Sequence, residues 1–231
     1  MLKLLLPILQ PFFRRKPFEF LHCLARGRFE IGSVIHVGAH LGQERVRYRE
    51  LGAREVLWIE GSPSIFAQLQ ASLDAERATG KLYGRHVAIN ALLTDRAGES
   101  VELHGTSNAG ASGSIFRMGD VHREKWPHVE HTGESETVIS ATLDEIAARE
   151  GFAMPDLLTV DVQGAELLVL RGGKKVLAEA KAVITEASTE KFYEGGVLFG
   201  ELNAFLREQG FMAMQRPRKH GDILFLRKSL L

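Results

Sequence analysis

The sequence has little of three features that commonly reveal the class of a protein: cysteine, unbalanced charge and long apolar runs. Its one cysteine, Cys23, cannot form a disulfide within the chain, which fits a reducing compartment and predicts a cytoplasmic protein. Lysine plus arginine and aspartate plus glutamate each number 29, so no net charge attracts nucleic acid. We therefore expect no nucleic-acid partner.

The first 16 residues contain an apolar stretch that needs a separate interpretation. Pro7 and Pro11 interrupt it, it precedes a basic cluster instead of following one, and it is too short to span a bilayer. Two interpretations remain. Either this arm packs on its own domain or on a second copy of the chain in a homodimer, or it contacts an anionic membrane surface. We favour the packed arm.

The length of 231 residues is sufficient for one α/β domain with modest additions. We expect an N-terminal arm and helix over residues 1–32, with Phe18, Leu21 and Leu24 packed on a sheet. The main domain is then predicted to cover residues 33–231.

The segment 34–42, VIHVGAHLG, is the first informative stretch. Its β-branched residues predict a buried strand, and Gly38 and Gly42 predict a turn into the helix that follows. The next strand, EVLWIE, ends on Glu60, which lies 22 residues beyond Gly38. A strand, a glycine turn, a helix and a carboxylate at this spacing are typical of a fold that binds the ribose of a nucleotide.

The composition of the turn favours one cofactor over another. His40 stands where the G-x-G-x-x-G pattern of dinucleotide-binding proteins has its second glycine, and an imidazole there opposes a diphosphate on the loop. S-adenosylmethionine has an adenosine ribose but no phosphate, so it fits better. A turn that serves only chain geometry remains the alternative. The residues expected to contact the cofactor here are Gly38, His40, Gly42, Glu60, Gly61, Ser62, Asn90 and Ala91.

Two of these residues have a second interpretation that the sequence leaves open. Ser62 precedes Pro63 as an N-cap precedes a proline at the first helical position. Asn90 follows a predicted strand, where it contacts the adenine or ribose or simply forms a turn.

The segment LLTVDVQGAELLVLRGG is the second informative stretch. An apolar strand ends on Asp161, and Gly164 permits a sharp exit into a helix. Ligands of open α/β sheets bind at the carboxyl ends of parallel strands, so Asp161 is expected to face a site. Glu166 lies in the first turn of the helix, where the helix dipole favours a carboxylate, and we expect a structural role for it.

Residues 104–135 are the least regular part of the sequence. Glycine, serine and asparagine dominate its first half, which predicts an irregular substrate-side loop. Its histidines do not have the spacing of a metal site, so we predict no metal ligand. We expect His122, His128 and His131 to be solvated surface residues, whereas His104 is a candidate catalytic histidine.

The end of the sequence predicts a change of strand direction. AVITEA is a further strand ending on Glu186, and the strands FMAMQ and ILFLRK are separated by a short turn. Such a short connection requires an antiparallel pair.

The chain resembles the FkbM family of S-adenosylmethionine-dependent O-methyltransferases. The matching segments are VIHVGAHLGQE, WIEGSP, TLDEI, LLTVDVQGAELLVLRGG, VITEAS, LREQGF and GDILFLRK, in the order of the family. The resemblance implies a Rossmann-like class I methyltransferase fold: a mostly parallel seven-stranded sheet with a C-terminal antiparallel hairpin and helices on both faces. It also implies methylation of a hydroxyl of a small molecule or glycan, such as a sugar or polyketide.

Three positions depart from the motifs of the family. His36 and His40 stand where the family usually has aspartate and asparagine, and Gln163 stands where it usually has glutamate. An amide at position 163 can still hydrogen-bond a hydroxyl or the ammonium group of the donor, so Gln163 is a further candidate cofactor contact.

The expected mechanism is an in-line displacement assisted by a general base. Asp161 is the first candidate, as a base or as a group that orients the donor, and His104 and His220 follow because histidine titrates near neutral pH. Two alternatives remain at this stage: an NAD(P)-dependent oxidoreductase, and a methyltransferase-like binding module without catalytic activity.

Overall fold

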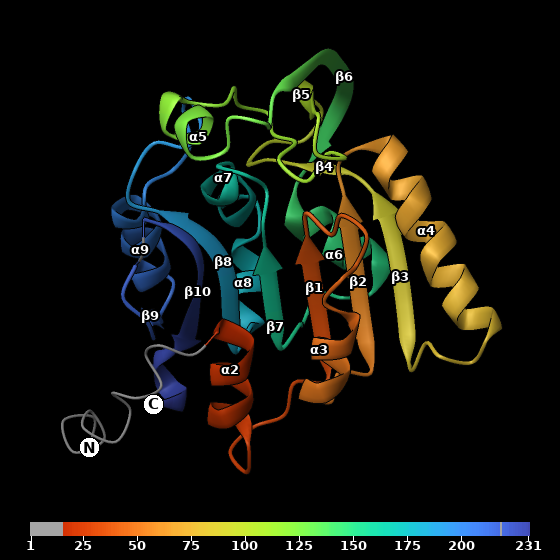
Figure 1. Cartoon of the computed structure of the whole chain (residues 1–231). Helices are drawn as coiled ribbons and strands as arrows, with labels where there is room; N and C mark the ends of the chain where they lie inside the picture. The colour runs from red at the N-terminus through yellow and green to blue at the C-terminus, as the bar shows by residue number, and fades with distance from the viewer. Residues whose placement is uncertain (1–15, 218) are drawn as a thin grey trace.

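A computed structural model describes residues 16–217 and 219–231 (Figure 1). The predicted contact of the first 16 residues with a membrane or a second subunit therefore falls almost wholly outside the described part of the chain. Within that part, none of the helices is both long and apolar enough to cross a membrane.

A seven-stranded sheet forms the centre of the molecule, with the strand order β3-β2-β1-β7-β8-β10-β9. All neighbouring pairs are parallel except the two that β10 makes with β8 and β9. The predicted mostly parallel sheet with an antiparallel hairpin is confirmed. The strands are β1 Ser33–Val37, β2 Glu55–Glu60, β3 Arg85–Asn90, β7 Leu157–Val160, β8 Ala182–Ser188, β9 Phe211–Ala213 and β10 His220–Arg227.

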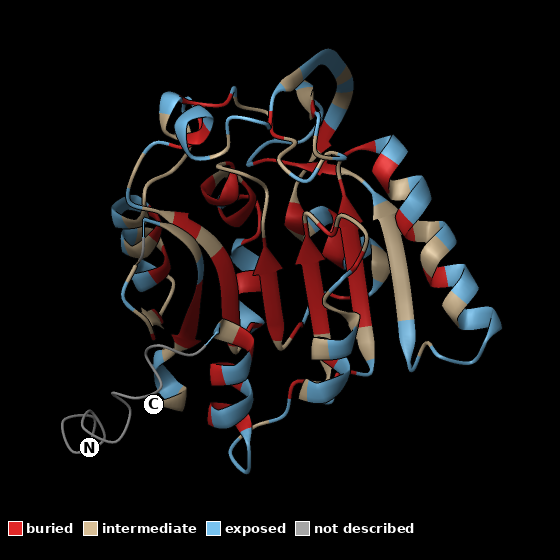
Figure 2. Ribbon diagram, in the orientation of Figure 1, coloured by how far each residue is buried: buried red, intermediate tan, exposed pale blue. Residues whose placement is uncertain are grey.

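Helices cover both faces of this sheet and enclose two apolar cores. Alternate strand residues serve the two cores, so that Val34 belongs to one and Ile35 to the other. The first core packs β1, β2, β7 and β8 against α6 Leu143–Glu150, α7 Glu166–Arg171, α8 Lys174–Glu179 and α9 Phe199–Glu208. The second packs the opposite face against α2 Pro17–Ala25, α3 Arg45–Leu51 and α4 Pro63–Ala78. Figure 2 shows the central strands buried along most of their length.

Helix starts agree with the local chemistry of the sequence. The Ser62 hydroxyl accepts a hydrogen bond from the Ile65 N–H, and Pro63 is the first residue of α4, which confirms the N-cap interpretation of Ser62. Thr142 and Glu145 form a reciprocal capping box at the start of α6. In α2, Phe18, Leu21 and Leu24 are buried in the second core, as predicted.

Residues 104–135 are only partly irregular, and the prediction for this segment was wrong at both ends. Strand β5 (Ser100–Thr106) pairs antiparallel with β6 (His131–Ala141), β6 pairs with β4 (Leu92–Leu93), and α5 spans Asp120–Lys125. Most residues of β6 are at least partly exposed, so it lacks the apolar alternation that reveals a strand in a sequence. The antiparallel pair of β5 and β6, called the β5–β6 ribbon below, lies above the carboxyl ends of the central strands (Figure 1).

Candidate functional site

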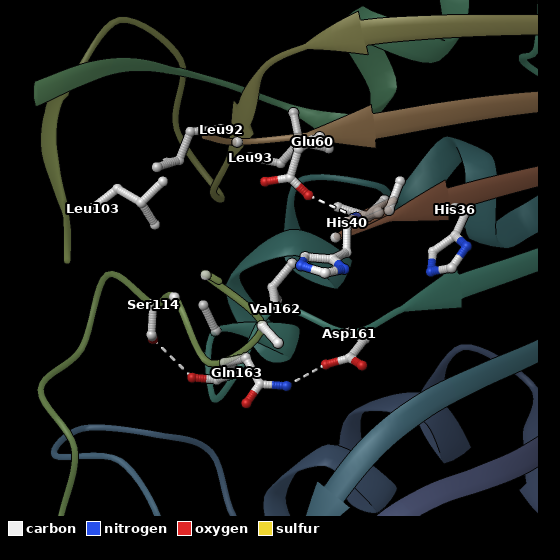
Figure 3. A pocket seen from close by; sticks show the side chains of 18 of the residues that line it. His36, His40, Glu60, Leu92, Leu93, Leu103, Ser114, Asp161, Val162 and Gln163 are labelled. Carbon is white, nitrogen blue, oxygen red and sulfur yellow. Dashed lines mark hydrogen bonds between the residues drawn. The ribbon is translucent and has the colours of Figure 1, made fainter. Parts of the chain in front are cut away.

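A cavity of about 320 Å³ opens at the carboxyl edge of the sheet, where β1, β2 and β7 end (Figure 3). Gly38, Glu60 and Asp161, each placed at this edge by the sequence, all line it. Leu92, Leu93 and Leu103 give the cavity an apolar part of its lining, and Leu92 and Leu93 lie beside Glu60 (Figure 3). The volume lies in the range of cavities that hold small molecules.

The glycine turn after β1 has a steric cause. Gly38 has φ 79°, and a Cβ on it would lie 1.7 Å from the backbone carbonyl oxygen of Asp161, so only glycine fits between the two strand ends. Gly42 also has a positive φ, and a Cβ there would meet Leu69 at 3.0 Å. Gly42 itself packs against the second core and is not among the residues that line the cavity.

Glu60 is fixed by the same turn. Its Oε2 accepts the backbone N–H of His40 at 2.8 Å, and its Oε1 accepts the backbone N–H of Ser62 at 2.9 Å. His40 adopts a left-handed conformation, φ 45°, which is uncommon for a residue with a side chain. Burial raises the pKa of Glu60, while these two N–H groups oppose the shift. The carboxylate is thus held at the cavity wall before any ligand arrives.

Asp161 belongs to a hydrogen-bonded group of partly buried polar side chains. The Gln163 side-chain amide donates to Asp161 Oδ1 at 2.6 Å and to Glu186 Oε2 at 3.2 Å, and Gln163 also has a left-handed backbone, φ 56°. Tyr193 donates its hydroxyl proton to Gln163 Oε1 at 2.5 Å, which fixes the orientation of the amide. Burial, followed by the neighbouring carboxylates Glu186 and Asp222, raises the pKa of Asp161 well above its usual value.

Among the residues described, Asp161, Glu166 and Glu186 bring carboxylate oxygens within 4.8 Å of one another, a spacing that could hold a metal ion. Each carboxylate already has a donor from the chain itself. Glu166 Oε1 accepts hydrogen bonds from the backbone N–H groups of Val162 and Gly164. The side-chain amide of Gln163 donates hydrogen bonds to the other two carboxylates. The trio therefore has a structural explanation in the turn that leads into α7.

A loop over residues 107–119, which we call the cover loop, covers the cavity and is hydrogen-bonded to the two turns beneath it. The Ser114 hydroxyl donates to the backbone carbonyl of Gln163 at 2.7 Å, and His40 Nε2 bonds the carbonyl of Ala109 at 3.1 Å. Gly110, Ala111 and Gly113 through Ile115 line the cavity from this side. The loop thus encloses whatever lies on the glycine turn.

The other predicted site residues lie around this cavity in different positions. Gly61 and Ala91 line it, whereas Ser62 lines a neighbouring cavity that shares Glu60. The Asn90 side chain donates to the carbonyls of Glu60 and Gly61, at 2.9 and 3.1 Å, and so holds the end of β2. Its proposed contact with adenine stays a prediction.

Neither of the two candidate catalytic histidines, His104 and His220, lines the cavity that holds Asp161. His104 borders the neighbouring cavity, with its ring 5.5 Å from that of His131. His220 bonds Ser188 Oγ at 2.7 Å and Glu186 at 3.0 Å, and burial lowers its pKa to about 4. Of the three predicted catalytic residues, Asp161 is the one that lines this cavity, and its role as a base stays a prediction.

Two of the three histidines predicted to be solvated are not. His122 is 1% exposed and packs on Trp126 and Tyr193, and burial lowers its pKa. His131 is partly buried, and its Nε2 accepts the Met118 backbone N–H. Only His128 is exposed as predicted. Their neighbours come from segments distant in the chain, so the sequence alone gave no signal of burial.

His36 is a cavity residue that the sequence did not single out for a role. It belongs to β1, is 3% exposed, and lines the cavity beside Gly38 (Figure 3). Its Nδ1 bonds the Tyr48 hydroxyl at 2.9 Å, and burial lowers the pKa of His36 to about 3. The sequence did contain one signal for this position, because His36 stands where the family motif usually has aspartate.

The strand order and the cavity at its carboxyl edge define a Rossmann-like fold of the class I methyltransferase type. The family model described as "Methyltransferase FkbM domain" matches residues 36–212. The chain belongs to this family, as the resemblance of its motifs implied.

The chain is also similar to two known proteins. The chain is similar to the 2-O-methyltransferase NoeI of Sinorhizobium fredii, with 26% identity over 198 residues that cover 83% of this chain and 77% of NoeI. It is also similar to the crystal structure of methyltransferase FkbM from Methylobacillus flagellatus KT, with a TM-score of 0.54 and 14% identity. That match covers 92% of this chain but spans only 48% of the other chain, and it establishes the fold alone.

Proposed function

We propose that the protein transfers a methyl group from S-adenosylmethionine to a hydroxyl oxygen of a small molecule or glycan. The observation that carries this proposal is the cavity itself, which has a fixed carboxylate, Glu60, and a second carboxylate, Asp161, on either side of a glycine turn. The similarity to a 2-O-methyltransferase supports oxygen as the acceptor atom.

The residues present fit an adenosine-containing donor. Glu60 can accept hydrogen bonds from a ribose diol, because each carboxylate oxygen has a lone pair beyond the one that its backbone donor uses. Leu92, Leu93 and Leu103 provide an apolar wall for adenine. The turn at Gly38 and Gly42 has His40 in place of a glycine, which opposes the pyrophosphate of a dinucleotide.

The chain's own contribution to the reaction is alignment and proton removal. The bound donor would supply a methyl group on a positively charged sulfur. The cover loop and the glycine turn hold the reacting groups in line, which supplies much of the acceleration. Asp161 accepts the hydroxyl proton as the oxygen–carbon bond forms and the carbon–sulfur bond breaks, with S-adenosylhomocysteine as the leaving group. Its raised pKa makes it a stronger base than an ordinary aspartate, and a nearby positive charge favours its ionised form.

The first experiment separates this proposal from an NAD(P)-dependent oxidoreductase. A ligand of the folded state raises the melting temperature by mass action, so we expect S-adenosylhomocysteine to stabilise the protein and NAD(H) not to do so. The reverse result would refute the proposal.

The second experiment separates an enzyme from a binding module without activity. The protein is incubated with methyl-labelled donor and a pool of hydroxylated metabolites and glycans, and label is sought in the products. Asp161→Ala should lose this transfer while still binding S-adenosylhomocysteine. Donor binding without transfer to any acceptor would favour the binding module.

A further inference from the structure

His36 is a buried polar residue of the cavity that the proposed mechanism does not use. It lies on the same face of the sheet as Trp58 and Tyr48, with its ring 5.4 and 5.9 Å from theirs. A polar group in such a place requires a hydrogen-bond partner. Its partners determine which of its two nitrogens carries the proton.

The hydrogen bonds of Tyr48 settle that choice. The Tyr48 hydroxyl has a single proton, which it donates to Thr159 Oγ1 at 3.0 Å. Its contact of 2.9 Å with His36 Nδ1 must therefore have Tyr48 as the acceptor. It follows that Nδ1 carries the proton of a neutral His36, and that Nε2 carries the lone pair.

No hydrogen bond from the described residues reaches Nε2, and among those residues the fully buried side-chain atoms without a partner are His122 Nδ1 and His131 Nδ1. Nε2 is therefore not fully buried, and because His36 lines the cavity, we infer that Nε2 is open to it. His36 lines the cavity together with Glu44 (Figure 3 shows His36 at one end of the site). A hydrogen-bond acceptor of fixed orientation is thus presented to a ligand.

We propose that His36 Nε2 accepts a hydrogen bond from the α-ammonium group of the methyl donor. This inference rests on the proposed function. With the ribose on Glu60, the amino-acid part of the donor extends along the glycine turn toward Gly38 and His36. The ammonium is the N–H donor in that part, and Glu44, which also lines the cavity, adds negative charge near it. The opposite tautomer would present an N–H, which suits a carboxylate instead.

Nitrogen NMR tests the tautomer without any enzyme assay. In the ligand-free protein labelled with ¹⁵N-histidine, His36 should give a protonated Nδ1 and an unprotonated Nε2 near neutral pH, since burial lowers its pKa to about 3. In Tyr48→Phe the acceptor of the Nδ1 proton is lost, so the Nε2–H tautomer should become populated. A protonated Nε2 in the wild-type protein would overturn the proposal.

Two ligands then locate the contact. S-adenosylhomocysteine carries the amino-acid group, whereas 5′-methylthioadenosine lacks it and serves as the matched control. The first should shift the Nε2 resonance and the second should leave it nearly unchanged. His36→Leu should weaken S-adenosylhomocysteine binding about ten- to a hundredfold, the effect of a hydrogen bond to a charged group, and leave methylthioadenosine binding unaltered.

The outcomes distinguish this inference from the proposed function. Failure of the wild-type protein to bind S-adenosylhomocysteine overturns both. Tight binding with an unmoved Nε2 resonance, or equal weakening of both ligands in His36→Leu, overturns the role of His36 alone.

Discussion

Glu60 illustrates how backbone N–H groups of other residues hold a side chain in place before a ligand binds. Its two oxygens are held by the backbone N–H groups of residues 40 and 62. The left-handed backbone of His40 is what aims the first of these groups. Pre-organisation of this kind lowers the entropic cost of binding, because the side chain does not have to be ordered when the ligand arrives.

We predict that Glu60→Ala weakens S-adenosylhomocysteine binding by about 1.5–3 kcal/mol, the value of a hydrogen bond to a charged group, with a smaller effect on turnover at saturating donor. Isothermal calorimetry measures the first quantity and a single-turnover assay the second. Glu60→Gln, which keeps the shape of the side chain, should retain part of the affinity. Unchanged donor affinity in Glu60→Ala would refute the ribose assignment.

Gly38 gives a second prediction at this scale. A methyl group there meets the Asp161 carbonyl, whereas Gly52 has a similar positive φ, 91°, with nothing within 4 Å of the added carbon. Gly52→Ala should therefore cost only the strain of the left-handed conformation, about 1–2 kcal/mol. Gly38→Ala should cost at least about 2 kcal/mol more, because the strand ends must separate. Urea denaturation of the two variants measures the difference, and equal losses would contradict the steric explanation.

Much of the candidate site could be predicted from sequence because its residues follow strand ends. Gly38, Glu60 and Asp161 were each placed at the carboxyl edge by a run of apolar residues before them, and parallel strands bring such ends together. Tyr193 and Ser114 could not be predicted in the same way. They reach Gln163 from loops, whose course depends on tertiary contacts that no periodicity encodes.

At the scale of elements, the cover loop and the β5–β6 ribbon form the part of the fold that the sequence described least well. The central strands have continuous apolar runs, but β6 exposes most of its residues. Strand β6 pairs antiparallel with β5, and the register of this pairing shifts between His104 and Thr106. A pattern based on burial cannot detect a strand whose two sides both meet solvent.

The attachment of the cover loop can be tested through Ser114. Its side chain is buried and holds the carbonyl of Gln163, so Ser114→Ala leaves that carbonyl without its donor. We predict a loss of about 1–3 kcal/mol in the free energy of unfolding and weaker donor binding. Ser100→Ala, at an exposed position of β5, is the control and should change neither. An unaltered Ser114→Ala protein in urea denaturation and calorimetry would show that the loop is held by other contacts.

At the scale of the whole molecule, buried ionisable groups couple stability to pH. Burial lowers the pKa of His36 to about 3, below its ordinary value of 6.5. The unfolded chain therefore binds a proton at pH values where the folded protein does not. The contribution of His36 to stability is complete above its unfolded pKa and is lost as the pH falls toward its folded pKa.

We predict that the wild-type protein loses stability faster than His36→Gln as the pH falls between these two pKa values. The difference in slope should approach about 1.4 kcal/mol per pH unit, the effect of one proton. Urea denaturation over a pH series measures it. The raised pKa values of the partly buried carboxylates Asp161 and Glu186 oppose this trend, but these groups are common to both proteins and cancel in the comparison. Parallel curves would mean that His36 is not held neutral.

The position of β10 has a consequence for biosynthesis. It follows β8 and β9 along the chain and yet lies between them, so those two strands share no ladder until it arrives. In a nascent polypeptide that has emerged only as far as α9, the edge of β8 that β10 later occupies is unpaired. Its backbone N–H and C=O groups can then form hydrogen bonds with another chain. Self-association during translation should concentrate in that interval, and chaperones that shield extended segments should matter most there.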